Sequence, residues 1–445
     1  MRWRLSPAGV RVRPAGAPQK ARTAVLIAMA VAVALGEVHA VLAAPTVTPL
    51  YSAGVALDTE GRLVRLAPKA PQDLLFPGTR VLRTADPRSA ALAEQQRQWL
   101  ASGTVPGGTG PIGDMVAEAL LDLHTLLQPN GAMIASWAAQ PWRYVWPRDA
   151  SFAAVALART GHPDDALRIL EFLQRVQPTD GLFQARYLPD GSGVPDQRGV
   201  ETDEVGWVLW AAQQLIESQP VSARPELRFA LRPMIDRSTA ALLTLTERGL
   251  PPASLDYWEI HDKKLSLGTA APVAVGLRSA AELEQQIGDA ALAGRVRQRA
   301  DLVEARIRSR FGTAGYPRYL GGTDQDASIA FLLPPFTTTV DRSVLASWRN
   351  ASARMARPGG GLAPGAEWPG SLSWTPQTAL FALTAASTGD RTLARQRLAW
   401  LATHRTTQGA LPEKVLSDGY PTGPAPLAWT GALAVLTAVT LEAAG

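Results

Sequence analysis

The sequence predicts an all-α protein in which paired helices form a closed ring with one functional face. About twelve segments after residue 111 carry apolar residues three and four positions apart, as amphipathic helices do. The connections between these segments alternate between short and long, and eight of the thirteen tryptophans lie in or beside the long ones. Helices that alternate up and down place all long connections at one end, and loops on a rigid scaffold commonly carry function.

The helical segments follow one another closely from residue 112 to residue 443. Glycine and proline mark tight turns at Thr160–Pro163, Gly288 and Thr388–Asp390. A helical solenoid is the alternative, but the sequence has no repeat of fixed period. We expect helices at roughly 112–127, 149–160, 164–177, 201–218, 225–248, 268–287, 289–310, 325–333, 341–356, 375–388, 390–405 and 426–443.

Residues 1–44 have the composition of an export signal. A basic stretch precedes the apolar run Ala24–Leu35, and small residues follow up to Ala40 and Ala44. The apolar run is short for a membrane span. Two interpretations stay open: a signal peptide that is removed, or an N-terminal membrane anchor. Either one predicts a protein that is secreted or held in the cell envelope, with membrane contact only if the segment is retained.

Charge and cysteine content exclude several classes of function. The chain has 44 basic and 39 acidic residues, but residues 1–44 hold six basic residues and one acid, so the remainder is neutral. Nucleic-acid binding is therefore not expected. Without cysteine there is no disulfide framework and no thiol nucleophile. The histidines lack metal-ligand spacing and no phosphate-binding glycine loop occurs, so we expect neither a metal nor a cofactor.

Residues 45–110 form an N-terminal extension and linker. Short apolar runs at 55–57 and 63–66 flank a turn of Asp58–Gly61, which predicts a β-hairpin. A short helix is expected at Ser89–Ala101, and the segment Ser102–Gly113 is rich in glycine and proline, as linkers are.

The most informative stretch for chemistry is Pro141–Ala150. Its aromatic residues alternate, and it ends in Arg148 and Asp149 directly before a helical segment. Flat aromatic faces beside a guanidinium and a carboxylate suit a polyhydroxylated ring, which has apolar faces and a rim of hydroxyls. A buried structural ion pair with core aromatics is the alternative interpretation.

Two glutamates in long connections could perform acid–base chemistry. Glu259 follows Trp258, and partial desolvation beside an aromatic ring would raise its pKa, as a general acid requires. Glu413 precedes Lys414, whose charge favours an ionised carboxylate, as a general base requires. Two carboxylates in an aromatic cleft fit glycoside hydrolysis, in which one protonates the leaving oxygen and the other activates water.

Four motifs occur in the order in which one known family carries them: Trp146–Asp149, Tyr257–Glu259, Thr323–Ala330, and Leu411–Glu413 with the following Pro426–Trp429. From about residue 112 to 443 the chain resembles the glucoamylases of glycoside hydrolase family 15. The resemblance implies an (α/α)6 barrel, a toroid of six helical hairpins, at residues 111–445. It also implies inverting release of glucose from non-reducing chain ends.

The resemblance further implies roles for individual residues. Glu259 would be the general acid and Glu413 the general base. Arg148 and Asp149 would bind hydroxyls of the terminal sugar, and the other substrate-binding residues would be Tyr144, Trp146, Tyr257, Trp258 and Trp429.

The chain departs from the family pattern at Ile260, which follows the expected acid, and at Thr430, where serine is usual. Phe183 and Tyr187 are the candidates for an aromatic residue that often follows the third helix. These differences bear on linkage and chain-length preference more than on the chemistry.

Other side chains admit a structural interpretation. Glu201, Asp203 and Glu204 are expected at a solvated helix start, where acidic residues are favourable, and the alternative is that Glu201 or Asp203 lines the cleft. Arg318 and Tyr319 belong either to a structural turn or to a sugar contact.

Two alternatives to a glucoamylase-like enzyme stay open. One is another sugar-active enzyme on the same ring, such as a trehalase-like hydrolase or a polysaccharide lyase. The other is a noncatalytic carbohydrate-binding or envelope protein, which would tolerate the loss of either glutamate. In all three cases the expected partner is an oligo- or polysaccharide, and the chain is expected to be a monomer.

Overall fold

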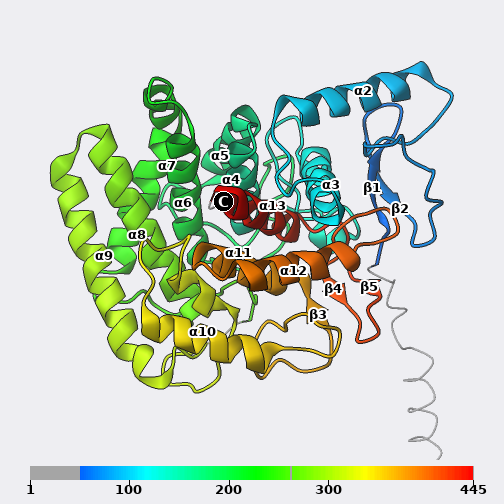
Figure 1. Cartoon of the computed structure of the whole chain (residues 1–445). Helices are drawn as coiled ribbons and strands as arrows, with labels where there is room; N and C mark the ends of the chain where they lie inside the picture. The colour runs from blue at the N-terminus through cyan, green and yellow to red at the C-terminus, as the bar shows by residue number, and fades with distance from the viewer. Residues whose placement is uncertain (1–50, 261–262, 444–445) are drawn as a thin grey trace, which may run out of the picture. The chain divides into compact units, whose positions relative to one another are not determined.

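The computed structural model describes residues 51–260 and 263–443, which belong to one compact unit, Leu50–Gly445 (Figure 1). The predicted hairpin is present: β1 (Gly54–Leu57) pairs antiparallel with β2 (Leu63–Leu66). The predicted short helix is α2 (Pro87–Ser102), capped at its start by the Asp86 carboxylate. The predicted export signal or anchor lies outside the described residues, and no described helix combines the length and apolar character of a membrane span.

All twelve predicted helical segments are present in the described part of the chain, eleven as α-helices and one as a 3-10 helix. Short 3-10 turns η1 (Gln140–Trp142) and η2 (Gly312–Ala314) lie in the connections. The twelve are α3 (Pro111–Leu126), α4 (Pro147–Arg159), α5 (Pro163–Val176), α6 (Asp203–Ser218), α7 (Arg224–Leu245), α8 (Leu267–Ile287), α9 (Ala290–Arg310), η3 (Ala327–Leu332), α10 (Arg342–Met355), α11 (Thr375–Ser387), α12 (Arg391–Thr403) and α13 (Ala428–Ala443).

The helices form a closed ring of six pairs. An inner ring runs through α4, α6, α8, η3, α11 and α13, each element in contact with the next, and α13 closes the ring against α4. Figure 1 shows α13, the last helix of the chain, lying among α3, α4 and α11. The other helix of each pair packs outside the inner one. The predicted all-α ring is therefore confirmed, and its closure excludes the solenoid.

Burial explains which helices lie inside. The inner helix α13 is apolar almost throughout and is buried on nearly every side. The outer helix α5 instead buries one stripe, which includes Ala166, Ile169, Leu170 and Leu173, while charged residues occupy its other face. A helix that is apolar all round must be enclosed, whereas an amphipathic one covers a core from outside.

The inner helices α6 and α8 approach each other closely at two glycines. A Cβ added to Gly206 would lie 2.0 Å from the carbonyl oxygen of Pro272, and one added to Gly276 would lie 2.5 Å from the Cα of Gly206. Backbone contact of this kind excludes any side chain. The width of the ring at this point therefore depends on these two residues.

The inner ring has one short member. The segment expected at 325–333 is helical, but it forms the 3-10 helix η3 instead of an α-helix. The Asp326 carboxylate accepts the Ser328 amide at its start, and Pro334 and Pro335, which lack an amide hydrogen, follow its end.

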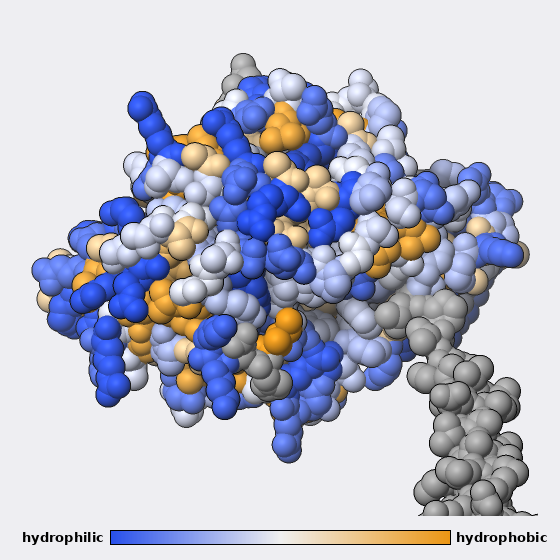
Figure 2. All heavy atoms as spheres, turned by 90° about the horizontal axis from the view of Figure 1, so that it is seen from below, coloured by the Kyte–Doolittle hydropathy of each residue, from blue (hydrophilic) through white to orange (hydrophobic). Residues whose placement is uncertain are grey.

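The surface is mixed in character. Figure 2 shows one face on which hydrophobic side chains form separate small groups between hydrophilic ones. The most exposed large apolar side chains are those of Phe229, Val221 and Tyr420. Apolar residues scattered in this way require no binding role.

Candidate active site

A cavity of ≈ 300 Å³ opens among the long connections at one end of the ring. Five of the six long connections contribute to it, which confirms that they gather at the same end. Five tryptophans supply most of its apolar surface. Its lining residues are Pro141, Trp142, Trp146, Arg186, Arg198, Tyr257, Trp258, Glu259, Pro364, Trp368, Trp374, Gln377 and Glu413.

Glu259 lies in the connection between α7 and α8. Its backbone has φ 53°, in the left-handed region that costs a residue with a side chain about 1–3 kcal/mol. The Asp256 carbonyl accepts the Glu259 amide at 2.7 Å, which holds the turn. The Trp146 indole donates to Glu259 Oε1 at 2.6 Å, and Arg198 forms an ion pair with Oε2. The carboxylate is thus aimed into the cavity by one aromatic and one cationic partner.

A buried network supports this turn. Arg318 donates to Asp256 at 2.9 Å and to Asp326 at 2.8 Å, and the Tyr257 hydroxyl donates to Asp326 at 2.9 Å. The Arg318 guanidinium also lies 3.9 Å from the centre of the Trp258 ring. Planar guanidinium groups suit such combined stacking and forked hydrogen bonding. Of the two interpretations of Arg318, the structural turn is the one that these contacts support.

Glu413 enters the cavity from the opposite side of the ring. It directly precedes β4 (Lys414–Val415), which pairs with β3 (Ser373–Trp374) and β5 (Pro421–Thr422) in a small antiparallel sheet. The Glu413 amide donates to the Pro424 carbonyl at 2.9 Å. A Cβ at Gly423 would lie 3.2 Å from Glu413 Oε2, so the absence of a side chain there leaves room for the carboxylate.

The environment of Glu413 combines burial with a cation. Burial raises the pKa of the Glu413 carboxyl, while Lys414 and a hydrogen bond from Trp142 lower it. The Lys414 ammonium lies 3.0 Å from Oε2 and 4.1 Å from the centre of the Trp374 ring. The prediction that Lys414 favours the ionised form is therefore confirmed in sign, although burial is the larger effect.

Below the cavity, Arg148 lies in a buried cluster of carboxyl groups. It donates to Glu201 at 2.8 Å and to Asp203 at 3.0 Å, and it lies 3.9 Å from Asp149. Glu204 is fully buried beside them, and neither of its carboxyl oxygens has a hydrogen-bond partner among the described residues. The expectation that these acidic residues are solvated at a helix start is wrong, because the start of α6 points into the barrel.

One guanidinium cannot neutralise four buried carboxylates, so protons must be retained there. Burial raises the pKa of Glu201 to about 8 and those of Asp149 and Asp203 to about 6, in each case against the charge of Arg148. The pKa of Glu204 is raised well above its usual value by burial and by its acidic neighbours. Like charges at this separation cannot all ionise.

The structure brings together five of the nine site residues expected from the sequence. Trp146, Tyr257, Trp258, Glu259 and Glu413 line the cavity. The other four are not among the lining residues: Arg148, Asp149, Tyr144 and Trp429. Among these, the Arg148 guanidinium lies 6.0 Å from the Tyr257 ring centre and 5.6 Å from that of Trp429, and the charge of Glu413 contributes to the raised pKa of Asp149.

Sequence reasoning missed several lining residues. Arg198 carried no motif, and only the folded chain shows that it reaches Glu259. The Arg186 guanidinium lies 4.7 Å from the ring centre of Tyr144 and 5.1 Å from that of Trp146, so it contacts both aromatic rings. For Trp368 and Trp374, the only indication in the sequence was that they lie in a long connection. The candidates Phe183 and Tyr187 are buried core residues outside the lining.

The described residues contain no group of three or more histidine, aspartate or glutamate side chains that could hold a metal ion. Within this part of the chain, the chemistry available to the cavity is that of two carboxyl groups, their cationic partners and the indole donors around them.

Comparison with known proteins shows what the chain resembles. No family model matches the chain. In sequence it is 34% identical over 101 residues to an uncharacterized glycosyl hydrolase of Methanocaldococcus jannaschii, a match that covers 22% of this chain and 16% of that protein. It is 27% identical over 303 residues to the isomaltose glucohydrolase of Kribbella flavida, covering 61% of this chain and 74% of that protein.

Solved structures share the fold. A glycosidase in complex with glucose has a TM-score of 0.66 and 20% identity, covering 78% of this chain and 98% of that one. A bacterial glucoamylase complexed with acarbose has a TM-score of 0.62 and 18% identity, covering 80% of this chain and 62% of that one. The chain therefore has the glucoamylase-like six-hairpin fold, and its named relatives and structural neighbours are glycoside hydrolases.

Proposed function

We propose that this protein is an exo-acting, inverting glycoside hydrolase that releases glucose from the non-reducing ends of α-glucans or α-gluco-oligosaccharides. One observation carries the proposal: Glu259 and Glu413, far apart in the sequence, line the same small cavity. The relative named as an isomaltose glucohydrolase supports glucose release, because the two chains match over 303 residues.

In the proposed mechanism Glu259 is the general acid. Its protonated carboxyl group transfers a proton to the glycosidic oxygen while the bond from that oxygen to the anomeric carbon breaks. The Arg198 charge then stabilises the carboxylate that remains. Since Arg198 contacts Glu259 Oε2, the leaving oxygen must approach through Oε1 or displace the guanidinium.

Glu413 is the proposed general base. Its carboxylate removes a proton from a water molecule, whose oxygen bonds to the anomeric carbon on the face opposite the leaving group, which inverts the configuration. This requires a gap of about 6.5–9.5 Å between the two carboxyl groups, whereas a retaining enzyme needs about 5 Å.

The cavity suits the end of a sugar chain. Its ≈ 300 Å³ volume is at the lower end of the range for small-molecule sites. The indole N–H groups of Trp258 and Trp374, both in the lining, have no acceptor among the described residues. The apolar faces of a sugar ring would stack on the indoles of the lining.

The experiment replaces each glutamate separately, as Glu259→Gln and Glu413→Gln, and measures glucose release from maltose, isomaltose and trehalose. Each change removes a proton-transfer group while the side-chain shape is kept, so turnover should fall by about 10²–10⁴-fold. Circular dichroism and the melting temperature report whether the fold persists.

Several results would contradict the proposal. Full activity in either variant would show that the replaced glutamate is not the general acid or the general base. Retained anomeric configuration by NMR removes the inverting mechanism, and activity on trehalose alone indicates a trehalase-like enzyme. An unsaturated, ultraviolet-absorbing product indicates a lyase, and binding without turnover of any sugar indicates a noncatalytic protein.

A further inference from the structure

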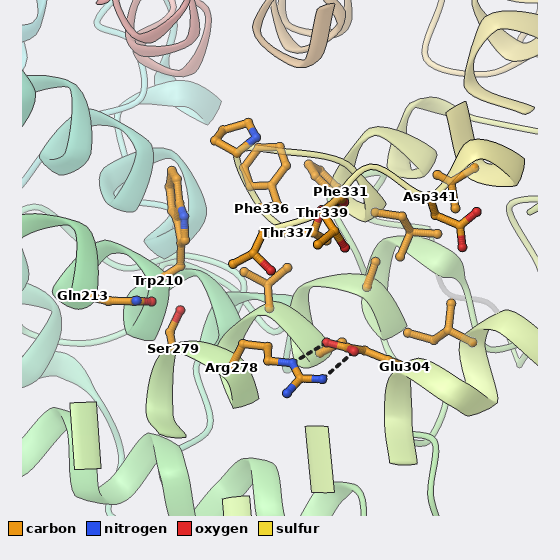
Figure 3. Close-up of a pocket in the computed structure, with 18 of the residues that line it drawn as sticks. Trp210, Gln213, Arg278, Ser279, Glu304, Phe331, Phe336, Thr337, Thr339 and Asp341 are labelled. Atoms are coloured by element: carbon orange, nitrogen blue, oxygen red, sulfur yellow. Dashed lines mark hydrogen bonds and ion pairs between the residues drawn. The ribbon is translucent and has the colours of Figure 1, made fainter. Parts of the chain in front are cut away.

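Two parts of the ring wall are built differently. Among α6, α8, α9 and η3, a hollow of ≈ 620 Å³ is bordered by the rings of Trp210, Phe331 and Phe336, which pack on one another and are at most 5% exposed (Figure 3). The connection from α12 to α13, which carries Glu413, is instead hydrogen-bonded to residues 51–83 of the N-terminal extension. These residues are called the hairpin segment below, because they contain β1 and β2.

The hairpin segment has a small apolar core of its own. Ala53, Ala56, Leu66 and Leu75 form this core, and each is at most 8% exposed. The Ala53 amide also donates to the Leu66 carbonyl at 3.1 Å, next to the antiparallel pairing of β1 with β2. Strand pairing and burial together fix the positions of Ser52 and Ala53.

Ser52 holds the backbone that follows the proposed base. Its hydroxyl is fully buried and donates to the Ala425 carbonyl at 2.7 Å. The preceding carbonyl of the chain, that of Pro424, accepts the Glu413 amide at 2.9 Å. Consecutive carbonyls therefore bond the hairpin segment on one side and the proposed base on the other.

The turn that precedes the proposed base is held as well. The Thr406 hydroxyl donates to the Ala53 carbonyl, and the Gln408 amide donates to the Pro71 carbonyl at 2.6 Å. Thr406 is 6% exposed and Gln408 is 8% exposed, so both bonds are largely shielded from water. Losing one partner of a buried hydrogen bond leaves the other unsatisfied, at a cost in free energy.

We propose that the hairpin segment positions the general base, with Ser52 and Thr406 as positioning residues. They hold the backbone on both sides of Glu413 and so keep its carboxylate aimed at the attacking water. This inference rests on the proposed function of Glu413. A displacement of about 1 Å in a catalytic group can lower the rate about 10²-fold, so the loss of one of these bonds should affect catalysis even when the fold persists.

The test compares serine variants of the full chain. Ser52→Ala removes the bond to the Ala425 carbonyl with a small loss of volume. Its kcat for glucose release from maltose or isomaltose should fall about tenfold, while KM changes less than about twofold, because the sugar-stacking residues Trp146 and Trp258 lie on other connections. The matched control is Ser89→Ala. Ser89 is another fully buried serine of the N-terminal extension, but its hydroxyl bonds that of Thr84, so kcat should stay at the native value.

A second pair of variants tests the turn. Thr406→Val keeps the shape of the side chain but removes the hydroxyl, whereas Thr406→Ser keeps the hydroxyl. Only the valine variant should lose kcat, again about tenfold. Circular dichroism and the melting temperature establish that the variants are folded, and the split between kcat and KM distinguishes positioning from general destabilisation. If Ser52→Ala does not fold, the Thr406 pair decides.

Native kcat in Ser52→Ala would overturn the proposal, as would a loss that Ser89→Ala shares or a rise in KM that accounts for the whole effect. Failure of the proposed function looks different. Full activity in Glu413→Gln would overturn that function and this inference with it. An inactive Glu413→Gln together with a native kcat in Ser52→Ala would overturn this inference alone.

Discussion

The replacement Lys414→Met tests how the proposed base is kept ionised. The Lys414 ammonium lies 3.0 Å from Glu413 Oε2 and 4.1 Å from the centre of the Trp374 ring. Methionine retains an unbranched apolar chain of similar size but removes the charge. Burial, which raises the pKa of Glu413, then acts with less opposition, so the pKa should rise further.

The size of the shift follows from the geometry. A cation within 4–6 Å lowers the pKa of a carboxyl group by about 1–3 units. The Lys414 side chain is 20% exposed, so water screens part of its charge. We therefore expect the pKa of Glu413 to rise further in the variant, because burial then acts without the opposing charge of Lys414. A general base works only when ionised, so activity is lost as the pH falls through this pKa, and a raised pKa moves that loss to higher pH.

The assay is kcat/KM for glucose release as a function of pH. In Lys414→Met the acidic side of the pH profile should move to higher pH. Lys69→Met, which removes an exposed lysine from the N-terminal extension, is the matched control and should leave the limb in place. An acidic limb that does not move in Lys414→Met, or moves equally in both variants, would refute the role of Lys414 and weaken that of Glu413.

Three further predictions concern other parts of the molecule. Gly206→Ala forces α6 away from α8 and should destabilise the protein by about 1–3 kcal/mol. Gly294→Ala, in open space on α9, is the control and should stabilise the protein by about 0.5–1 kcal/mol. Urea unfolding measures the free energy of unfolding of both variants. Glu204 must bind a proton in the folded state, so its contribution to stability is present below the unfolded pKa and is lost as the pH rises toward the higher folded pKa. Glu204→Gln should thus raise the melting temperature at pH 8 but not at pH 4, and equal effects at both would contradict this. Arg198→Gln removes the charge that favours ionised Glu259. Because the general acid works only when protonated, the loss of kcat/KM at alkaline pH should move to higher pH. A profile that does not move would show that Arg198 does not influence the protonation of Glu259.

The sequence alone determined the all-α class, the order of the helices and the end of the ring that carries the candidate site. Helix periodicity and turn residues are local properties, so they can be read without knowing the fold. The alternation of short and long connections then implied one functional face. Trp146, Trp258, Glu259 and Glu413 could be named because they lie in these long connections and because their motifs resemble those of the glucoamylases.

Only the tertiary structure decided which distant side chains meet. Arg198 reaches Glu259, and Arg148 joins Glu201 and Asp203 below the cavity, because the ring closes in one particular way. Burial also reversed the expected character of the acidic residues at the start of α6, since exposure depends on what surrounds a helix and not on its own composition.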